Sequence, residues 1–400
     1  MNNKYNVIAL GARDYYEIAK ALNNEMRLNK LITDFYSPDF LRKRLKKRFD
    51  ETLSSKLSLS FFIYIYIYKF LFTILKFKKP DTKNIDYFFG FISAIYTYFS
   101  TNNAIVYSYY LEGFCKFYSL INKKPNRLIV FQVHPTYWHV NKILKEDQSK
   151  YSQIYGEFKK EHENDCTFIE YDNYIDALKK CDLIICASNF TKESIYSYKK
   201  IDVKTLVIPY GNRFEINEAL LSRPRNIGPK IKLLTVGQVI QRKGLHHIFP
   251  IISKYKSYFE WKIISNVIDP VIMKQIPENV ELIGKLSNED LKKEFIDADL
   301  FILPSLVEGF GLVFIESACL GTPILCSNNT GAADFLNDRY SSFIVEAGNI
   351  DELEKTILFI INNKEKLLEM RKNVMSDVEK LTWFEFRKSV IDVISSIDNE

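Results

Sequence analysis

Short apolar segments alternate with segments of helical periodicity along the whole sequence, and this alternation limits the chain to α/β folds with parallel sheets. The apolar segments of the first half are rich in β-branched residues and apolar on both faces. Strands of that kind are buried on both sides, as in a parallel sheet covered by helices above and below. The predicted strands of the first half are Asn6–Leu10, Lys30–Phe35, Ala104–Tyr107, Arg127–Val133, Asp182–Ala187 and Lys204–Ile208, and its clearest helical patterns are Asp14–Met26 and Thr191–Tyr198.

The second half repeats this plan. A single hydrophobic core stops growing near about 250–300 residues, so 400 residues predict two domains. We place the N-terminal domain at 1–210 and the C-terminal domain at 211–380, with a seam at Pro209–Asn212 and a polar stretch at Ser222–Lys230. Both are predicted as doubly wound α/β units. The predicted strands of the second half are Ile231–Val236, Trp261–Ser265, Val280–Ile283, Leu300–Leu303, Ile324–Cys326 and Ser342–Val345, and the predicted helices are Leu245–Tyr255, Asn288–Ile296, Leu312–Leu320 and Ile350–Asn362.

The composition is that of a globular protein, with 47% hydrophobic and 26% charged residues. A net charge of +6 is too mild to indicate a nucleic-acid ligand. None of the six cysteines forms a C-x-x-C pair, so neither a zinc site nor a disulfide framework is expected. The N-terminal residues show no signal region, and we expect a cytoplasmic protein.

One segment has the length of a membrane span. Leu57–Phe77 is apolar and aromatic, but Lys69 lies inside it, at a cost of about 2.5–3.5 kcal/mol near a helix centre. The basic cluster Arg42–Arg48 precedes it. A basic cluster next to an aromatic stretch is typical of a surface that lies on anionic lipid. We therefore interpret residues 42–77 as a peripheral contact on the inner face of the membrane, with a buried helix or hairpin as the first alternative and a true membrane span as the second.

Residues able to carry chemistry follow several of the predicted strands. Gly11 follows the first strand, and His134 follows Arg127–Val133. In the second half, Gly237 and then Arg242-Lys243 follow Ile231–Val236. Open α/β sheets bind ligands outside the carboxyl ends of their strands. In two facing domains these loops would line one cleft.

The sharpest motif is the run Glu308-Gly-Phe-Gly-Leu-Val-Phe-Ile-Glu316. Glycines at 309 and 311 allow the backbone to approach a ligand, and the helix that follows offers N–H groups to a phosphate. Glu316 lies about two helical turns beyond Glu308, so the two carboxylates can contact different parts of one extended ligand. A carboxylate accepts hydrogen bonds from sugar hydroxyls, while Arg242 and Lys243 are suited to a diphosphate.

These motifs resemble the retaining glycosyltransferases of family 4, which belong to the glycosyl transferases group 1 and have the GT-B fold of two Rossmann-like domains facing across a cleft. The N-terminal half matches more weakly, through Gly11, His134 and Ala187–Thr191. Trp383-Phe-Glu resembles the last helix of the family, which implies that residues 381–400 cross back to the N-terminal domain. The matching pieces of the second half are Leu234–Gly237, Arg242–Gly244, Val280–Gly284, Ala298–Ser305, the E-x7-E motif from Glu308 to Glu316, and Gly321–Pro323.

The resemblance implies a set of roles. Glu316 would hold the ribose of a nucleotide sugar, Glu308 would lie beside the donor sugar, and Lys243 with Arg242 would neutralise the diphosphate. His134 would approach the donor sugar from the N-terminal domain. The implied donor-binding positions are Gly11, Gly237, Gly284, Lys285, Gly309, Phe310, Gly311, Leu312 and Glu316, with Gly284 and Lys285 at the base pocket.

The implied activity is transfer of a sugar from a nucleotide-diphosphate sugar to a glycan or lipid-linked acceptor, with retention of anomeric configuration and without a metal or other cofactor. Synthesis of a cell-surface polysaccharide is the expected context. The sequence departs from the family at Gln238, where an arginine is usual, and at Asp334, where a glutamate is usual. A non-catalytic GT-B subunit and a nucleotide-sugar 2-epimerase remain alternatives. His246 and His247 are expected on a helix surface or in packing, and Asp297-Ala-Asp299 is not expected to bind metal.

Overall fold

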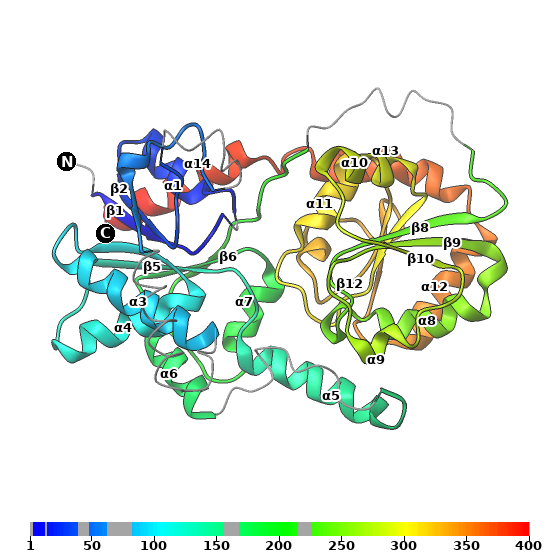
Figure 1. The fold of residues 1–400 in the computed structure, drawn as a ribbon, viewed down its shortest axis with the longest axis horizontal. Helices are drawn as coiled ribbons and strands as arrows, with labels where there is room; N and C mark the ends of the chain where they lie inside the picture. Colours follow the sequence, from blue (N-terminus) through cyan, green and yellow to red (C-terminus); the bar gives the residue numbers. More distant parts are fainter. Residues whose placement is uncertain are drawn as a thin grey trace.

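The computed structural model describes residues 3–12, 14–38, 48–61, 82–155, 168–214 and 226–399. They form two α/β bodies that lie side by side, each built on a fully parallel sheet (Figure 1). Among the residues with defined positions, no helix combines the length and the apolar character that crossing a membrane requires. The predicted fold class, two doubly wound domains of GT-B type, is confirmed.

The N-terminal sheet has seven strands in the order β3-β2-β1-β4-β5-β6-β7. Its strands are β1 (Tyr5–Ile8), β2 (Leu28–Thr33), β3 (Ser58–Ser60), β4 (Asn103–Tyr107), β5 (Arg127–Gln132), β6 (Leu183–Cys186) and β7 (Thr205–Val207). Its helices are α1 (Glu17–Asn24), α3 (Thr82–Tyr98), α4 (Leu111–Leu120), α5 (Tyr137–Tyr155), α6 (Phe168–Leu178) and α7 (Asn189–Tyr196). All residues of β1, β4 and β6 are buried, as expected for a sheet covered on both faces.

The C-terminal sheet has six strands in the order β10-β9-β8-β11-β12-β13. Its strands are β8 (Ile231–Val236), β9 (Phe259–Ile264), β10 (Val280–Ile283), β11 (Leu300–Leu303), β12 (Ile324–Ser327) and β13 (Ser342–Val345). Its helices are α8 (Leu245–Lys254), α9 (Pro270–Met273), α10 (Asn288–Asp297), α11 (Leu312–Cys319), α12 (Ile350–Asn362) and α13 (Lys366–Val378). Strand order reverses between β8 and β11, and ligands of doubly wound sheets bind at such a switch point. The loops after these two strands carry Arg242, Lys243 and Glu308.

Most predicted elements are confirmed to within a few residues, and the differences have local causes. The first helix was expected from Asp14 but begins at Glu17, because Tyr15 and Tyr16 have φ of 53° and 61°. Backbone in that left-handed region cannot continue a right-handed helix. The strand Ser58–Ser60 was not predicted, and it pairs in parallel with β2 at the sheet edge. Residues 58–60, near the start of the aromatic segment Leu57–Phe77, therefore belong to the N-terminal sheet.

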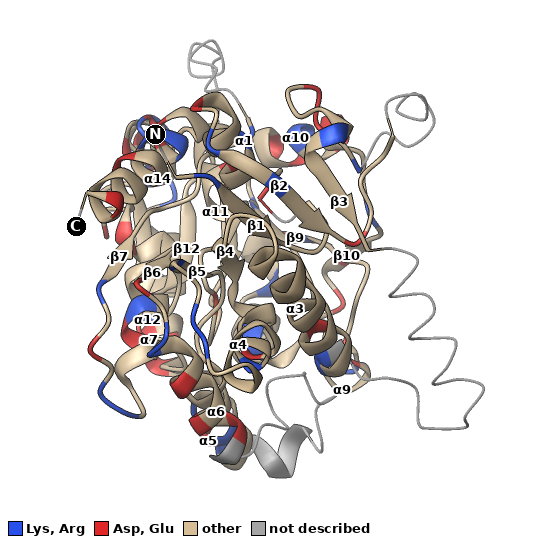
Figure 2. Cartoon of the chain, turned by 90° about the vertical axis from the view of Figure 1, so that its left-hand side faces the viewer, with Lys and Arg blue, Asp and Glu red and all other residues tan. Residues whose placement is uncertain are grey.

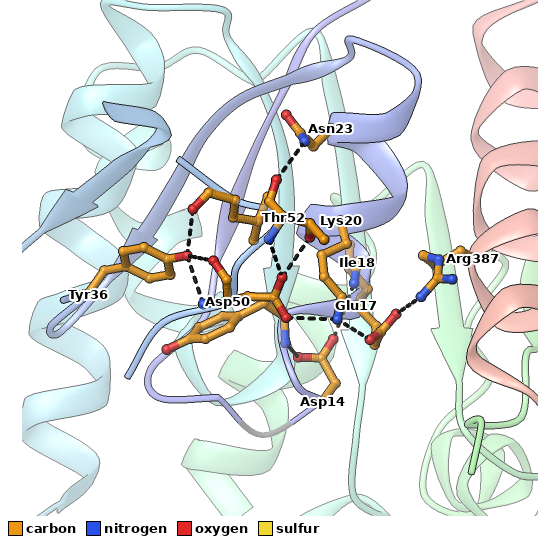
Figure 3. A network of polar contacts seen from close by, with 11 residues as sticks. Asp14, Glu17, Ile18, Lys20, Asn23, Tyr36, Asp50, Thr52 and Arg387 are labelled. Carbon is orange, nitrogen blue, oxygen red and sulfur yellow. Dashed lines mark hydrogen bonds and ion pairs between the residues drawn. The ribbon is translucent and has the colours of Figure 1, made fainter. Parts of the chain in front are cut away.

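The last helix, α14 (Trp383–Asp398), returns from the C-terminal body to the N-terminal one, where it lies beside α1 (Figure 1). Arg387 forms an ion pair with Glu17 of α1, which also pairs with Lys20 (Figure 3). Lys20 in turn contacts Asp50 at 3.0 Å. This chain of charges fixes α14 on the N-terminal domain, so the two bodies are joined both through residues 208–214 and through the last helix.

Candidate active site

Two loops meet at the switch point of the C-terminal sheet. The loop after β8 forms a short 3-10 turn, Gln241–Lys243, and the loop after β11 leads to Glu308. The N–H of Val307 donates to the carbonyl of Arg242 at 3.2 Å. Gly244 has φ of 66°, and a Cβ there would lie 2.1 Å from the Pro304 carbonyl oxygen. Only glycine permits this approach, which places the Arg242-Lys243 pair directly against the second loop.

Glu308 is the centre of a cluster of charges. Lys243 pairs with its carboxylate Oε2, and Arg242 Nη1 lies 3.2 Å from the same oxygen. Burial by itself would raise the pKa of Glu308, but the charges of Lys243 and Arg242 outweigh it and lower the pKa to about 2. The carboxylate is therefore ionised at neutral pH, and the cluster of two cations and one anion carries a net charge of +1. Such a cluster can accept an anionic ligand without first taking up a proton.

The glycine loop after Glu308 leads directly into α11. Gly311, with φ of 78°, is the N-cap of α11, and this helix begins without a side-chain cap. The first N–H groups of a helix are suited to a phosphate. The Phe310 side chain is buried and packs on the ring of Tyr210, with ring centroids 5.3 Å apart. Because this side chain is occupied in packing, a ligand at position 310 can contact only the backbone.

The N-terminal domain closes over this loop. A Cβ on Gly309 would lie 2.7 Å from the carbonyl oxygen of Val133 and 3.3 Å from Cα of His134. The hydroxyls of Ser188 and Thr191, at the start of α7, both donate to the Gly309 carbonyl. His134 is thereby brought to the Glu308 cluster, and its charge adds a small contribution to the lowered pKa of that carboxyl.

Glu316 occupies a different environment on α11. Its Oε1 lies 2.7 Å from Nε of Arg213, a residue just after the seam between the domains. Burial raises the pKa of Glu316, and the nearby Arg213 charge only partly opposes that shift. A cavity of about 630 Å³ lies beside Arg213, lined by Tyr15 and Trp383 among others. Glu316 is thus paired with one cation, Arg213, which lies in the connection between the two domains and not in the C-terminal sheet.

The other predicted donor positions lie at strand ends around this centre. Gly237 and Gly284 follow β8 and β10, and a Cβ at either would meet no atom within 4 Å. Lys285 is exposed next to Gly284, two strands away from Gly237 in the sheet. Gly11 lies in the loop after β1 with φ of 70°, and its N–H donates to Asp34 at 3.1 Å. In the structure, Glu308, Arg242, Lys243, Gly309 and His134 lie against one another. Gly237, Gly284 and Lys285 instead lie along the same edge of the C-terminal sheet.

Several residues at this site were not singled out from the sequence. Arg213 follows the predicted seam, but nothing in the local pattern shows that its charge meets Glu316. Ser188 and Thr191 lie in the segment Ala187–Thr191 that carried the weaker resemblance, and Ser188 also caps α7 by accepting from the Thr191 N–H. His246 and His247 are both buried, so a surface position is wrong and packing is right.

The comparisons with known proteins agree with this fold. Solved structures with the GT-B arrangement align over the whole chain: sucrose-phosphate synthase from Thermosynechococcus elongatus has a TM-score of 0.70 at 14% identity, covering 100% of both chains. The Anabaena protein HepE in complex with UDP-glucose has a TM-score of 0.65 at 12% identity, covering 99% of this chain and 100% of that one. At these identities the likeness shows the fold.

Sequence similarity to known families lies mainly in the C-terminal half. Residues 219–376 match the model of glycosyl transferases group 1. An uncharacterized glycosyltransferase of Methanocaldococcus jannaschii is 25% identical over 212 residues, which are 52% of this chain and 57% of that protein. The match thus spans little more than half the length of that relative. Over residues 219–376 the chain is thus similar to glycosyl transferases group 1, and the whole chain has a GT-B fold, in agreement with the resemblance inferred from the E-x7-E motif.

Proposed function

We propose that the protein is a retaining glycosyltransferase that moves a sugar from a nucleotide-diphosphate sugar to a glycan or lipid-linked acceptor. The observation that carries the proposal is the cluster of Lys243, Arg242 and Glu308 at the switch point. It lies beside the uncapped start of α11 and under the N-terminal domain. Cations, a carboxylate and a helix N-terminus are the groups that a sugar diphosphate requires, and here they meet in one place.

The chemistry follows from the charges. Breaking the bond between the sugar and the phosphate builds negative charge on the diphosphate and positive charge on the sugar. Lys243, Arg242 and the start of α11 stabilise the first, because fixed positive groups act strongly where water is excluded. Glu308, ionised at neutral pH, lies where it can stabilise positive charge on the sugar. Two cations already face the leaving group, so the proposed reaction requires no metal or cofactor.

The donor is proposed to bind along the C-terminal half of the site. Glu316 Oε1 faces Arg213, which leaves its second carboxylate oxygen for a ribose hydroxyl. Gly237, Gly284 and Lys285 would surround the base at the open strand ends. A uridine nucleotide is the first donor to test, because the structurally similar HepE was solved with UDP-glucose.

Calorimetric titration of UDP, GDP, ADP and CMP into the wild type and into Glu316→Ala tests this assignment. We expect one nucleoside diphosphate to bind the wild type and to bind the variant about tenfold to a hundredfold more weakly, since hydrogen bonds to a charged group contribute about 1.5–3 kcal/mol. Glu354→Ala, which removes a surface carboxylate paired with Lys254, is the matched control and should bind normally. Absence of binding by every nucleotide would contradict the proposal.

A non-catalytic GT-B subunit is the second candidate, and Gln238 is the observation that favours it. This exposed residue stands where the family usually has an arginine, and Arg242, four residues on, is paired with Glu308. If Arg242 replaces the missing charge, the protein turns over a nucleotide sugar in the presence of acceptor. Nucleotide binding without any release of sugar would instead assign the subunit role. A 2-epimerase would release the isomerised sugar without an acceptor.

We also propose a cytoplasmic location with contact to anionic lipid through residues 42–77, in the synthesis of a cell-surface polysaccharide. Most of that segment lies outside the residues that the structure describes. The face of the N-terminal domain drawn in Figure 2 mixes basic and acidic positions, so the lipid contact rests on the segment itself. Replacing the basic residues of Arg42–Arg48 with glutamine should reduce sedimentation with vesicles of anionic lipid. Unchanged sedimentation would remove the membrane contact from the proposal.

A further inference from the structure

A carboxylate of the N-terminal domain reaches across to the C-terminal domain next to the cation pair. Asp147 lies on α5, and its Oδ1 is 2.6 Å from Nε2 of His247, while its Oδ2 is 3.1 Å from Nε2 of His246. The side-chain amide of Gln241 donates to Oδ2 at 2.9 Å and also to the carbonyl of Leu144. All four side chains are buried, with exposures of 6% or less.

The three titratable groups have ligand atoms within 4.8 Å of one another, so a metal ion has to be weighed against hydrogen bonding. In a tetrahedral site with ligands at about 2.0–2.1 Å from zinc, two ligand atoms lie roughly 3.3 Å apart. The 2.6 Å separation between Asp147 and His247 is instead a hydrogen-bond distance. Each oxygen of Asp147 already faces an imidazole nitrogen. The geometry favours a hydrogen-bonded cluster.

The protonation states fit this reading. Burial lowers the pKa of His246, so its imidazole is neutral at pH 7 and can donate its Nε2–H. Burial acts to raise the pKa of Asp147, but hydrogen bonds from His246 and His247 outweigh it and hold the pKa below its usual range. A buried carboxylate with several donors remains charged and fixed in orientation.

The donors to Asp147 lie on both sides of the cation pair in the sequence. Gln241 directly precedes Arg242 and Lys243, and the two histidines follow within the first turn of α8. One carboxylate of the opposite domain therefore holds the cation segment on both sides. Beside it, an apolar cluster joins the same elements: Val140 and Leu144 of α5, Phe190 of α7, and Leu306 and Val307 of the loop that leads to Glu308.

We propose that Asp147 is a positioning residue that couples closure of the two domains to the placement of Arg242 and Lys243 for the diphosphate. This inference rests on the proposed function, because it assumes that the two cations bind a nucleoside diphosphate. When the domains are closed, Asp147 accepts from Gln241, His246 and His247 and fixes the backbone between them. When they separate, those donors lose their shared acceptor and the cation segment loses its support.

The variants Asp147→Asn, His247→Gln and His247→Phe test the proposal. Asp147→Asn and His247→Phe should raise the KM for the donor and the Kd for UDP by about five- to 150-fold, the usual range of coupling between sites. His247→Gln retains a neutral N–H donor near the position of Nε2, so it should stay close to wild type. Asp172→Asn, a surface carboxylate of the same domain paired with Lys199, is the control. Thermal unfolding of each variant separates a local effect from loss of the fold.

The outcomes decide the matter. Folded Asp147→Asn and His247→Phe proteins that bind UDP as the wild type does would overturn the proposal. So would stoichiometric zinc in the purified wild type that is lost in His247→Gln, because the cluster would then be a metal site. If the wild type binds no nucleotide, the proposed function fails separately, and small-angle scattering still tests the coupling. Asp147→Asn should then enlarge the radius of gyration of the free protein, and an unchanged radius would reject the role of Asp147 in closure.

Discussion

The two glutamates of the E-x7-E motif are eight residues apart, yet their surroundings give them opposite acid–base behaviour. Glu308 lies in the loop after β11, where Lys243 and Arg242 of its own domain lower its pKa to about 2. Glu316 lies on α11 against the linker, where Arg213 alone opposes burial and the pKa is raised. Both carboxylates are largely removed from water, so the number of adjacent cations decides whether the pKa is raised or lowered.

The comparison separates two tasks within one motif. The Glu308 end holds a surplus of positive charge, which suits a leaving group that becomes more negative during the reaction. The Glu316 end is a single ion pair in a buried setting, which suits a neutral group with hydroxyls. Variants at the first end should therefore act mainly on turnover, and variants at the second mainly on binding.

Lys243→Ala should have the largest effect. It removes the cation in closest contact with Glu308 and, by the proposal, one charge facing the diphosphate. We expect kcat to fall about 10²–10³-fold, as on removal of a group that stabilises developing negative charge. The kcat is measured from the release of nucleoside diphosphate in the presence of acceptor. Lys232→Ala, which removes an exposed lysine paired with Asp297, should leave turnover unchanged. A Lys243→Ala enzyme with nearly normal kcat would place the leaving group elsewhere.

Glu316→Gln should affect binding more than turnover. The amide keeps the shape of the side chain but loses the charge that faces Arg213, and with it the strong acceptor for a ribose hydroxyl. We expect the Kd for the nucleoside diphosphate to rise about tenfold to a hundredfold. Calorimetry measures the Kd, and the same variant assayed at saturating donor should keep most of its kcat. Loss of kcat without loss of affinity would reverse the division of tasks between the two glutamates.

Gly309→Ala should disturb the site through the other domain. The added Cβ would lie 2.7 Å from the Val133 carbonyl oxygen, a contact that requires the domains to move apart. We expect kcat to fall about tenfold as the positioning of His134 is lost, with a smaller change in nucleotide affinity. Gly228→Ala is the control, because its Cβ would meet the nearest atom at 3.7 Å, an ordinary contact. Equal activity of the two variants would show that closure over Gly309 is not required.

The finest test compares stability against pH for Glu308→Gln and Glu316→Gln. The folded pKa of Glu308 is depressed, so its contribution is present above its unfolded pKa near 4.5 and is lost as pH falls toward about 2. The folded pKa of Glu316 is raised, so wild type loses stability as pH rises from about 4.5 through that higher pKa.

The free energies of unfolding of the two variants should therefore diverge between pH 4 and 8. The stability deficit of Glu308→Gln relative to wild type should stay nearly constant above about pH 5.5, whereas the stability of Glu316→Gln relative to wild type should increase as pH rises. Urea unfolding at several pH values gives both differences. Parallel curves for the two variants would show that Arg213 stabilises Glu316 as fully as two cations stabilise Glu308.

The elements that depend on local pattern were predictable from the sequence. Four strands of the C-terminal sheet have the predicted bounds, because each is a short, largely apolar run. The Glu308 loop and the Arg242-Lys243 pair were found because parallel strands bring their carboxyl ends to one edge. Boundaries failed where backbone torsion decided them, as at Tyr15 and Tyr16, and the edge strand Ser58–Ser60 was hidden at the start of an aromatic segment.

By itself the sequence determined the two doubly wound sheets, the glycosyl transferases group 1 motif and the loops at which its charges gather. Periodicity and glycine positions are encoded locally, so they can be read along the chain. Tertiary structure alone decided which charges meet. Arg213 reaches Glu316, and Asp147 reaches His247 across the two domains, only when residues about a hundred positions apart pack together. Their pKa shifts and their roles depend on that burial, which no linear pattern specifies.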